Sequence, residues 1–209
     1  MAYDSSWAVP SKVSGNGDDV VSWHASSANT GRNYRSTTAT FTASGVENKI
    51  LTIVQNGKTE FVSFSDSTAT VSKDGGTLTI TGTSNSSKLT FALTGTNGIG
   101  LTLPSSYTAN SVSTNNGSAI TGDPGASQQY TFSITFSSIG ANATTSSKTS
   151  QLTVTPNSGS GDAVVCTITQ AAGDAYLTIS PDTITIPAAG GQENAQSVSV
   201  SSNTNWSIS

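Results

Sequence analysis

The chain has 209 residues, of which only 10% are charged, and its 12 acidic and 8 basic side chains give a formal net charge of -4. These few, scattered Lys and Arg residues argue against nucleic acid as the main partner, because phosphate binding requires clustered positive charge. No run of about 18 apolar residues predicts a membrane span. With 37 Ser and 33 Thr, the composition favours strands that have one solvent-exposed face.

The N-terminal segment combines a polar background with several large apolar side chains. Residues 1–7 contain no basic segment followed by an apolar one, so they do not predict an export signal. Large apolar side chains near a terminus are typical of an interface. We therefore expect five residues to form an anchor that contacts a partner protein: Trp7, Val9, Val20, Val21 and Trp23.

Alternation of apolar and polar residues predicts strands through the rest of the chain. The alternating segments are 77–81, 132–136, 177–180, 184–186 and 197–201. Turn signals separate them, and they include Asp74-Gly75-Gly76, Asn116-Gly117, Asp123-Pro124-Gly125 and Gly190-Gly191. No segment predicts a helix. The sequence therefore predicts an all-β fold.

An internal repeat runs through the chain. Residues 51–76 align without a gap with residues 166–191, at an offset of 115 residues. Identical positions include Gln55 and Gln170, Ile53 and Ile168, and Gly75-Gly76 and Gly190-Gly191. The segments upstream of these, 28–41 and 141–154, match more weakly. Downstream, with a small insertion in one copy, the match continues to Ser84-Asn85 and Ser202-Asn203. This period is too long for a solenoid and fits one immunoglobulin-like sandwich of about 100 residues.

The repeat divides the chain into three pieces. Residues 1–58 form a partial module without the usual first half, residues 59–173 form a complete sandwich, and residues 174–209 form the first strands of a further module. A sandwich that stops at residues 206–209 cannot close its core. We expect a longer natural polypeptide or completion by a partner strand, with hinges near residues 57–60 and 171–175.

The third piece resembles a known family. The runs Leu177–Pro181, Ala188–Gly191, Val198–Val200 and Ser202–Trp206 closely resemble the opening half of a BACON domain, an immunoglobulin-like module common in Bacteroidetes proteins and in the crAss-like phages that infect these bacteria. Residues 35–55 and 148–170 look like two copies of the closing half. The resemblance implies tandem immunoglobulin-like sandwiches, with the first atypical and the third incomplete, and suggests carbohydrate binding.

The aromatic residues are the best candidates for glycan contact, because a flat ring can stack on a sugar. The resemblance suggests contacts from Asn203, Asn205 and Trp206, whereas Lys88 stands at the position of Trp206 in the second piece. A tryptophan in a sandwich packs more often in the core. Ile208 shares the strand parity of Trp206, which favours an inward-facing ring.

The residues that carry catalysis are scarce. His24 is the only histidine and Cys166 the only cysteine, so the usual zinc ligand sets are excluded. Cys166 aligns with Leu51, which indicates a packing position. The acidic loop 15–19 lacks the spacing of a calcium loop, and a solvated turn is favoured over a metal site. We expect no enzyme activity and no cofactor.

Two functions fit these features. The first is a structural and adhesive protein of a virion, such as a phage head or tail fibre, anchored by its N-terminus to a capsid protein and displayed on the virion surface. A homotrimer is the favoured state because the fibre interpretation implies it. The alternative is a glycan-binding array of a bacterial surface or secreted protein.

Overall fold

The computed structural model describes residues 3–157 and 161–209. Its regular structure consists of strands, and the only helical segment among these residues is the short 3-10 helix Gln192–Asn194. The prediction of an all-β fold is confirmed. No helix in the described part of the chain is long and apolar enough to cross a membrane.

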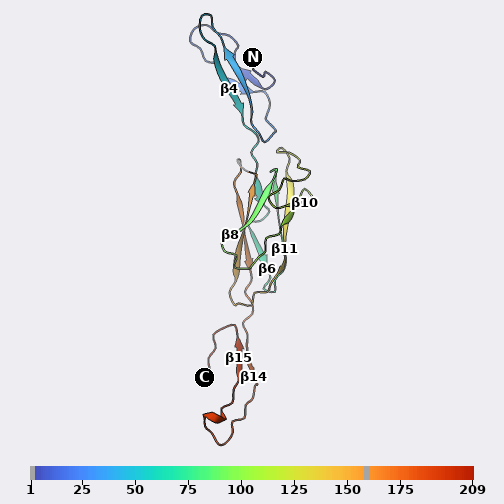
Figure 1. Cartoon of the computed structure of the whole chain (residues 1–209), viewed down its shortest axis with the longest axis vertical. Helices are drawn as coiled ribbons and strands as arrows, with labels where there is room; N and C mark the ends of the chain where they lie inside the picture. Colours follow the sequence, from blue (N-terminus) through green and yellow to red (C-terminus); the bar gives the residue numbers. More distant parts are fainter. Residues whose placement is uncertain (1–2, 158–160) are drawn as a thin grey trace.

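The strands fall into three groups that follow one another along the long axis of the molecule (Figure 1). We refer to residues 3–58 as the N-terminal unit, 59–173 as the central unit and 174–209 as the C-terminal unit. The N-terminal unit contains two hairpin-like pairs, β1 (Ala8–Pro10) with β2 (Trp23–Ala25) and β3 (Arg35–Phe41) with β4 (Lys49–Gln55). The C-terminal unit contains the pair β14 (Leu177–Ser180) and β15 (Ser199–Ser202).

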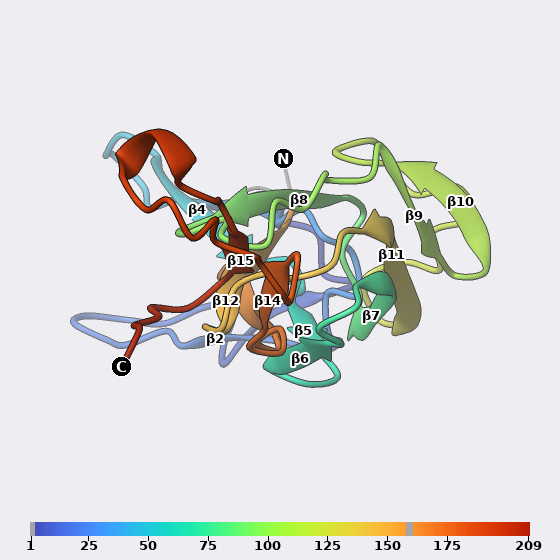
Figure 2. The same ribbon diagram turned by 90° about the horizontal axis from the view of Figure 1, so that it is seen from below.

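The central unit is sandwich-like and contains two sheets. One sheet has the order β10-β9-β11-β7-β5 and the other the order β6-β13-β12-β8. Their strands are β5 (Val62–Phe64), β6 (Thr68–Val71), β7 (Gly76–Ser84), β8 (Leu89–Thr94), β9 (Ser106–Ala109), β10 (Val112–Asn115), β11 (Tyr130–Ile139), β12 (Lys148–Pro156) and β13 (Val164–Gln170). Seen from below, the β9–β10 hairpin projects to one side (Figure 2).

The core of the central unit follows from the period-2 pattern of its strands. Phe132 and its β11 neighbours two and four residues on are each no more than 2% exposed, because alternate side chains of a strand point to the same face. Phe132 makes edge contacts with Phe64 at 5.9 Å and Phe91 at 5.6 Å between ring centroids. Gly82 is required beside it, since a Cβ there would lie 2.3 Å from the Phe132 ring.

The predicted repeat appears in the strand registers. In β3 and β4, Arg35 is the partner of Gln55, and in β12 and β13 Lys148 is the partner of Gln170. The first strand pairs of the central and C-terminal units also have equivalent registers. Val62 is the partner of Ser84 in β5 and β7, and Leu177 is the partner of Ser202 in β14 and β15. The first comparison relates the N-terminal to the central unit, and the second relates the central to the C-terminal unit.

Hydrogen bonds of one asparagine repeat along with the strands. The side-chain oxygen Oδ1 of Asn85 accepts from the Phe61 amide at 2.7 Å, and Oδ1 of Asn203 accepts from the Tyr176 amide at 3.0 Å. The side-chain amide of Asn85 donates to Thr59 O at 3.1 Å, as that of Asn203 does to Asp174 O at 2.9 Å. These asparagines therefore fix the entry of the chain into the two units in the same way.

The predicted strand at 184–186 is wrong, because residues 181–191 contain no strand. The equivalent strand of the central unit, β6, lies parallel to β13 at the edge of its sheet. The described part of the C-terminal unit contains no counterpart of β13. Without that partner, the backbone of residues 183–186 has no ladder in which to hydrogen-bond.

Two buried tyrosines predict alkaline unfolding of the central unit. Burial raises the pKa of Tyr130, whose hydroxyl donates to Ser86 O at 2.7 Å, and burial also raises the pKa of Tyr107. Below pH 10 both states hold these protons; above it the unfolded chain releases them first, so stability falls as pH rises. We expect a loss of at most roughly 1.4 kcal/mol per pH unit for each retained proton.

Urea unfolding at pH 8, 10 and 11 measures this loss. Tyr130→Phe serves as the control, because it removes one of the two phenolic protons and should reduce the slope against pH even though it also removes a hydrogen bond. A free energy of unfolding that stays constant up to pH 11 in the unsubstituted chain would contradict the assignment.

Candidate functional site

A groove of about 380 Å³ opens in the N-terminal unit between β3 and the segment that connects β1 with β2. Its apolar wall contains Tyr3, Val21, Trp23, Ala39 and Phe41. The rings of Tyr3 and Trp23 meet edge to face, with their centroids 5.0 Å apart. The indole N–H of Trp23 is buried without an acceptor among the described residues, and such a group costs about 1–3 kcal/mol.

The groove corresponds to the core of the central unit. The offset of 113 residues that aligns Arg35 with Lys148 also aligns groove residues with fully buried core residues. These pairs are Val21 with Ile134, Trp23 with Phe136, Ala39 with Leu152 and Phe41 with Val154. Val154 is completely buried, whereas Phe41 is 46% exposed. The N-terminal unit thus presents a sandwich core that is partly open among the described residues, because the β1–β2 pair supplies only part of the covering sheet.

The polar rim of the groove contains one ion pair. Lys12 donates to the carboxylate of Asp19, whose second contact is the Val20 amide at 2.8 Å. The Lys12 hydrogen bond, followed by that of Val20, holds the pKa of Asp19 below its ordinary value. Both side chains are more than a third exposed, so the pair closes the 12–19 loop but adds little stability.

The structure separates the five predicted anchor residues. Val21 and Trp23 line the groove, Val20 is 79% exposed and Val9 is half-buried in β1. Trp7 is only 4% exposed, and the Arg35 guanidinium lies 4.8 Å from its ring centroid. Trp7 therefore packs inside the unit instead of facing a partner.

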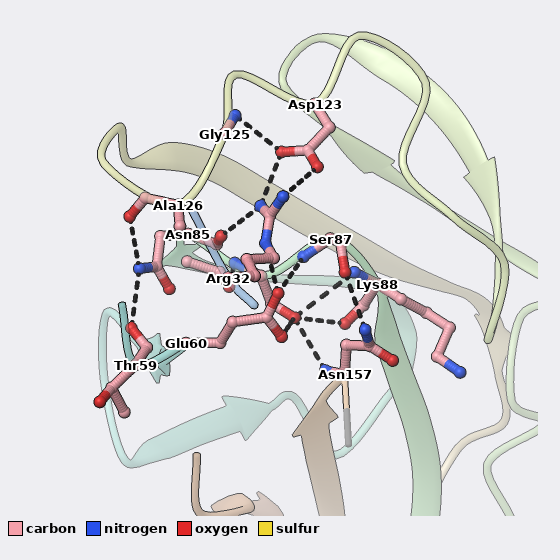
Figure 3. Close-up of polar contacts among 12 residues, drawn as sticks. Arg32, Thr59, Glu60, Asn85, Ser87, Lys88, Asp123, Gly125, Ala126 and Asn157 are labelled. Atoms are coloured by element: carbon pink, nitrogen blue, oxygen red, sulfur yellow. Dashed lines mark hydrogen bonds and ion pairs between the residues drawn. The ribbon is translucent and has the colours of Figure 1, made fainter. Parts of the chain in front are cut away.

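A charged junction joins the N-terminal unit to the central unit (Figure 3). Arg32, from the loop between β2 and β3, binds both carboxylate oxygens of Asp123 at 2.7 and 2.8 Å. It also donates to Asn85 O at 2.7 Å, and its Nε forms an ion pair with Glu60. Bidentate arginine contacts of this kind fix both distance and orientation.

The carboxylates of Asp123 and Glu60 offset the cost of partly burying the Arg32 guanidinium. Burial by itself lowers the pKa of Arg32, but the hydrogen bond and charge of Asp123, followed by those of Glu60, outweigh it and raise the pKa above its ordinary value. The Glu60 carboxylate is only 4% exposed and also accepts from the Ser86 hydroxyl at 2.9 Å and the Ser87 amide at 3.1 Å. The guanidinium stays charged at every pH at which the protein folds.

Glycine and backbone contacts complete the first junction and recur at the second. The Lys58 amide donates to Gly31 O, and the Gly173 amide donates to Thr144 O, each at 2.7 Å. Gly57 is required because a Cβ there would lie 2.0 Å from Arg32 O. At the second junction Asn203 donates to Ala143 O at 3.0 Å, and Lys73 pairs with Asp174.

The three candidate glycan residues lie in the C-terminal unit. Trp206 is 51% exposed and Asn205 is exposed, whereas the Asn203 amide is bound by backbone groups of residues 143, 174 and 176. The expected inward ring of Trp206 is wrong, and Ile208 is 88% exposed as well. The described part of this unit contains no second sheet against which either side chain could pack.

The only histidine and the only cysteine of the chain lie in different environments. His24 is an exposed residue of β2, and Cys166 is fully buried in β13, where burial raises the pKa of its thiol. The loop 15–19 is exposed. Within residues 3–157 and 161–209, no three His, Cys, Asp or Glu side chains gather in a way that could hold a metal ion.

Sequence reasoning missed the Arg32 junction. Its three charged residues come from loops, where no periodicity shows which side chain points inward. The one available signal was Arg32 itself, because it is one of only 8 basic residues in the chain.

Comparison of the chain with protein-family models and with curated proteins finds no match.

Proposed function

We propose that the chain is a non-enzymatic structural protein in which tandem immunoglobulin-like sandwich units act as a rigid spacer. The observation that supports this most strongly is the Arg32 junction, in which one side chain bridges Glu60, Asn85 and Asp123 of the neighbouring unit. A flexible tether would not need a partly buried, bidentate ion pair. The three units lie in line rather than folding back on one another (Figure 1).

The N-terminal groove is the proposed attachment site of this spacer. It exposes apolar residues whose counterparts in the central unit are buried, and large exposed apolar surfaces of soluble proteins mark interaction sites. An edge strand or loop of a support protein would cover them. In the preferred setting the support is a capsid protein, and the chain is part of a phage head or tail fibre, as the resemblance of residues 174–206 to BACON domains suggests.

Small-angle X-ray scattering, extrapolated to zero concentration, tests the spacer. A compact protein of 209 residues has a radius of gyration of roughly 17 Å. We expect a clearly larger value and a distance distribution with the long tail of a rod. A radius of gyration near the compact value would show that the units fold back on one another and would refute the spacer.

The alternative function is glycan binding by a bacterial surface or secreted protein. The exposed ring of Trp206 beside Asn205 favours it, because sugars stack on open aromatic faces. Mucin oligosaccharides should then quench tryptophan fluorescence of the chain, and Trp206→Ala should abolish the effect, whereas Trp7→Phe, at a buried ring, should preserve it. Antibodies against the central unit distinguish the two settings by labelling either virions or bacterial cells.

A further inference from the structure

The N-terminal and C-terminal units contain opposite halves of the central sandwich. The N-terminal unit has the counterparts of β12 and β13 in β3 and β4, and a counterpart of β11 in β2. The C-terminal unit has the counterparts of β5 and β7 in β14 and β15. In the central unit these two sets of strands enclose one core.

The C-terminal half exposes the residues that this core would bury. Four exposed apolar side chains of the C-terminal unit correspond to buried side chains of the central unit. Their exposed fractions lie between 38% and 65%, whereas those of their counterparts are 9% or less. The pairs are Leu177 with Val62, Ile179 with Phe64, Ile186 with Val71 and Val198 with Ile80. No described residue of the C-terminal unit is buried. Its opening hairpin is formed, and its described residues contain no opposing sheet.

The N-terminal half leaves open the positions that these strands would take. In the central unit the carbonyl oxygen of Thr131 in β11 accepts from the amide of Asn110, which directly follows β9. Thr135 lies four residues further along β11, so its carbonyl oxygen points to the same side, toward β9. Ser22 corresponds to Thr135, and its carbonyl accepts from Ser11, next to β1. Strand β1 therefore occupies the β9 side of β2, and the side that corresponds to β7 is unoccupied among the described residues.

The Gln55 amide donates to one backbone carbonyl, whereas the amide of its counterpart Gln170 donates to two. The Gln170 amide donates to Gly140 O at 2.8 Å and to Ser72 O, just after β6, at 3.3 Å. The Gln55 amide donates to Ser27 O, which corresponds to Gly140 O, at 3.0 Å. The N-terminal unit has no counterpart of Ser72 among its described residues.

We propose that the C-terminal unit of one copy docks on the N-terminal groove of a second copy, so that the chains associate head to tail. Residues 183–186 of the first copy extend the β3–β4 sheet of the second, parallel to residues 52–55, as β6 lies parallel to β13. The expected register places Thr183 opposite Thr52 and Ile186 opposite Gln55. Leu177, Ile179 and Val198 cover the wall formed by Val21, Trp23 and Phe41.

This geometry produces an open chain of copies. The two surfaces differ, so the contact is heterologous and does not close unless the rotation between copies allows a ring. The units lie at opposite ends of the elongated molecule (Figure 1), so copies can join without bending. Every groove except that of the first copy is filled, which leaves one groove for attachment to a support.

Complementary variants test the docking by sedimentation of the full chain. Phe41→Asp disables the groove, and Ile179→Asp disables the apolar face of the C-terminal unit. Each variant alone should be monomeric, because the dissociation constant should rise roughly 30-fold or more, as at a binding hot spot. An equimolar mixture should form a 1:1 dimer that does not grow, because one intact groove meets one intact face. Val46→Asp, at a valine of the β3–β4 turn that is even more exposed than Phe41 and Ile179, should associate like the unsubstituted chain.

A register-specific disulfide gives an independent readout. Chains with Val54→Cys and chains with Thr185→Cys should cross-link when mixed, since these positions are opposite each other on the outer face. Chains with Val54→Cys and Ile184→Cys should not, because their side chains point to opposite faces. A monomeric unsubstituted chain, a concentration-independent trimer, or a variant mixture without dimers would overturn the proposal and leave the spacer function intact.

Discussion

Phe132→Ala is expected to lower the free energy of unfolding of the central unit by about 3–5 kcal/mol, the usual cost of removing a buried phenylalanine. Phe132 is 2% exposed and contacts both Phe64 and Phe91, so its removal leaves a cavity between the two sheets. Amide hydrogen exchange in β11 and β12 measures the change, because these strands open only when the whole unit unfolds.

Phe41→Ala is the matched control. It removes the same side chain from the position equivalent to the core residue Val154, but Phe41 is 46% exposed in the open groove. We expect a change within about 0.5 kcal/mol, as at other exposed sites. A loss of similar size for both substitutions would show that Phe41 lies in a closed core and would contradict the open groove of the N-terminal unit.

Arg32→Met is expected to loosen the first junction. Methionine keeps an apolar stem but removes the bidentate contact with Asp123 and the ion pair with Glu60. Because Glu60 retains its contacts with Ser86 and Ser87, the cost should be about 1–3 kcal/mol, that of a lost buried hydrogen-bonded charge contact. Limited proteolysis at residues 56–59 should accelerate roughly 5- to 160-fold for a loss of about 1–3 kcal/mol.

Two further variants identify the cause. Arg35→Met removes an arginine whose contacts among the described residues, with Gln55, Ser27 and Trp7, all lie within the N-terminal unit. Cleavage at 56–59 should therefore stay at its original rate. Asp123→Asn combined with Arg32→Met should cost less than the sum of the two single changes, since the residues act as one contact. Additive effects would show that Arg32 and Asp123 do not interact in solution.

Strand positions and the repeat could be predicted because both depend on local pattern. Alternation fixes which face of β11 or β14 is apolar, and Gln55 and Gln170 mark the ends of equivalent strands. The predictions for 184–186 and for Trp206 failed for one shared reason. Both assumed a complete sandwich, and a strand or an inward ring requires a partner sheet, which the described part of the C-terminal unit does not contain.

The junction and the groove could not be predicted in the same way. Glu60 and Asp123 meet Arg32 from positions 28 and 91 residues further along the chain, and no local pattern records such a meeting. Trp7 and Trp23 look alike in sequence, as apolar residues in a polar segment. Only the cation above the Trp7 ring and the open face beside Trp23 separate an internal residue from one that lines the groove.

Backbone ¹⁵N relaxation of the dilute, monomeric chain tests the rigid spacer most directly. Relaxation rates report how each amide group tumbles, so units joined rigidly share one rotational diffusion tensor and units on a flexible tether do not. We predict that amides of β3, β4, β11 and β12 fit a single elongated tensor and that Arg32→Met separates them. Independent, faster tumbling of β3 and β4 in the unsubstituted chain would contradict the rigid spacer.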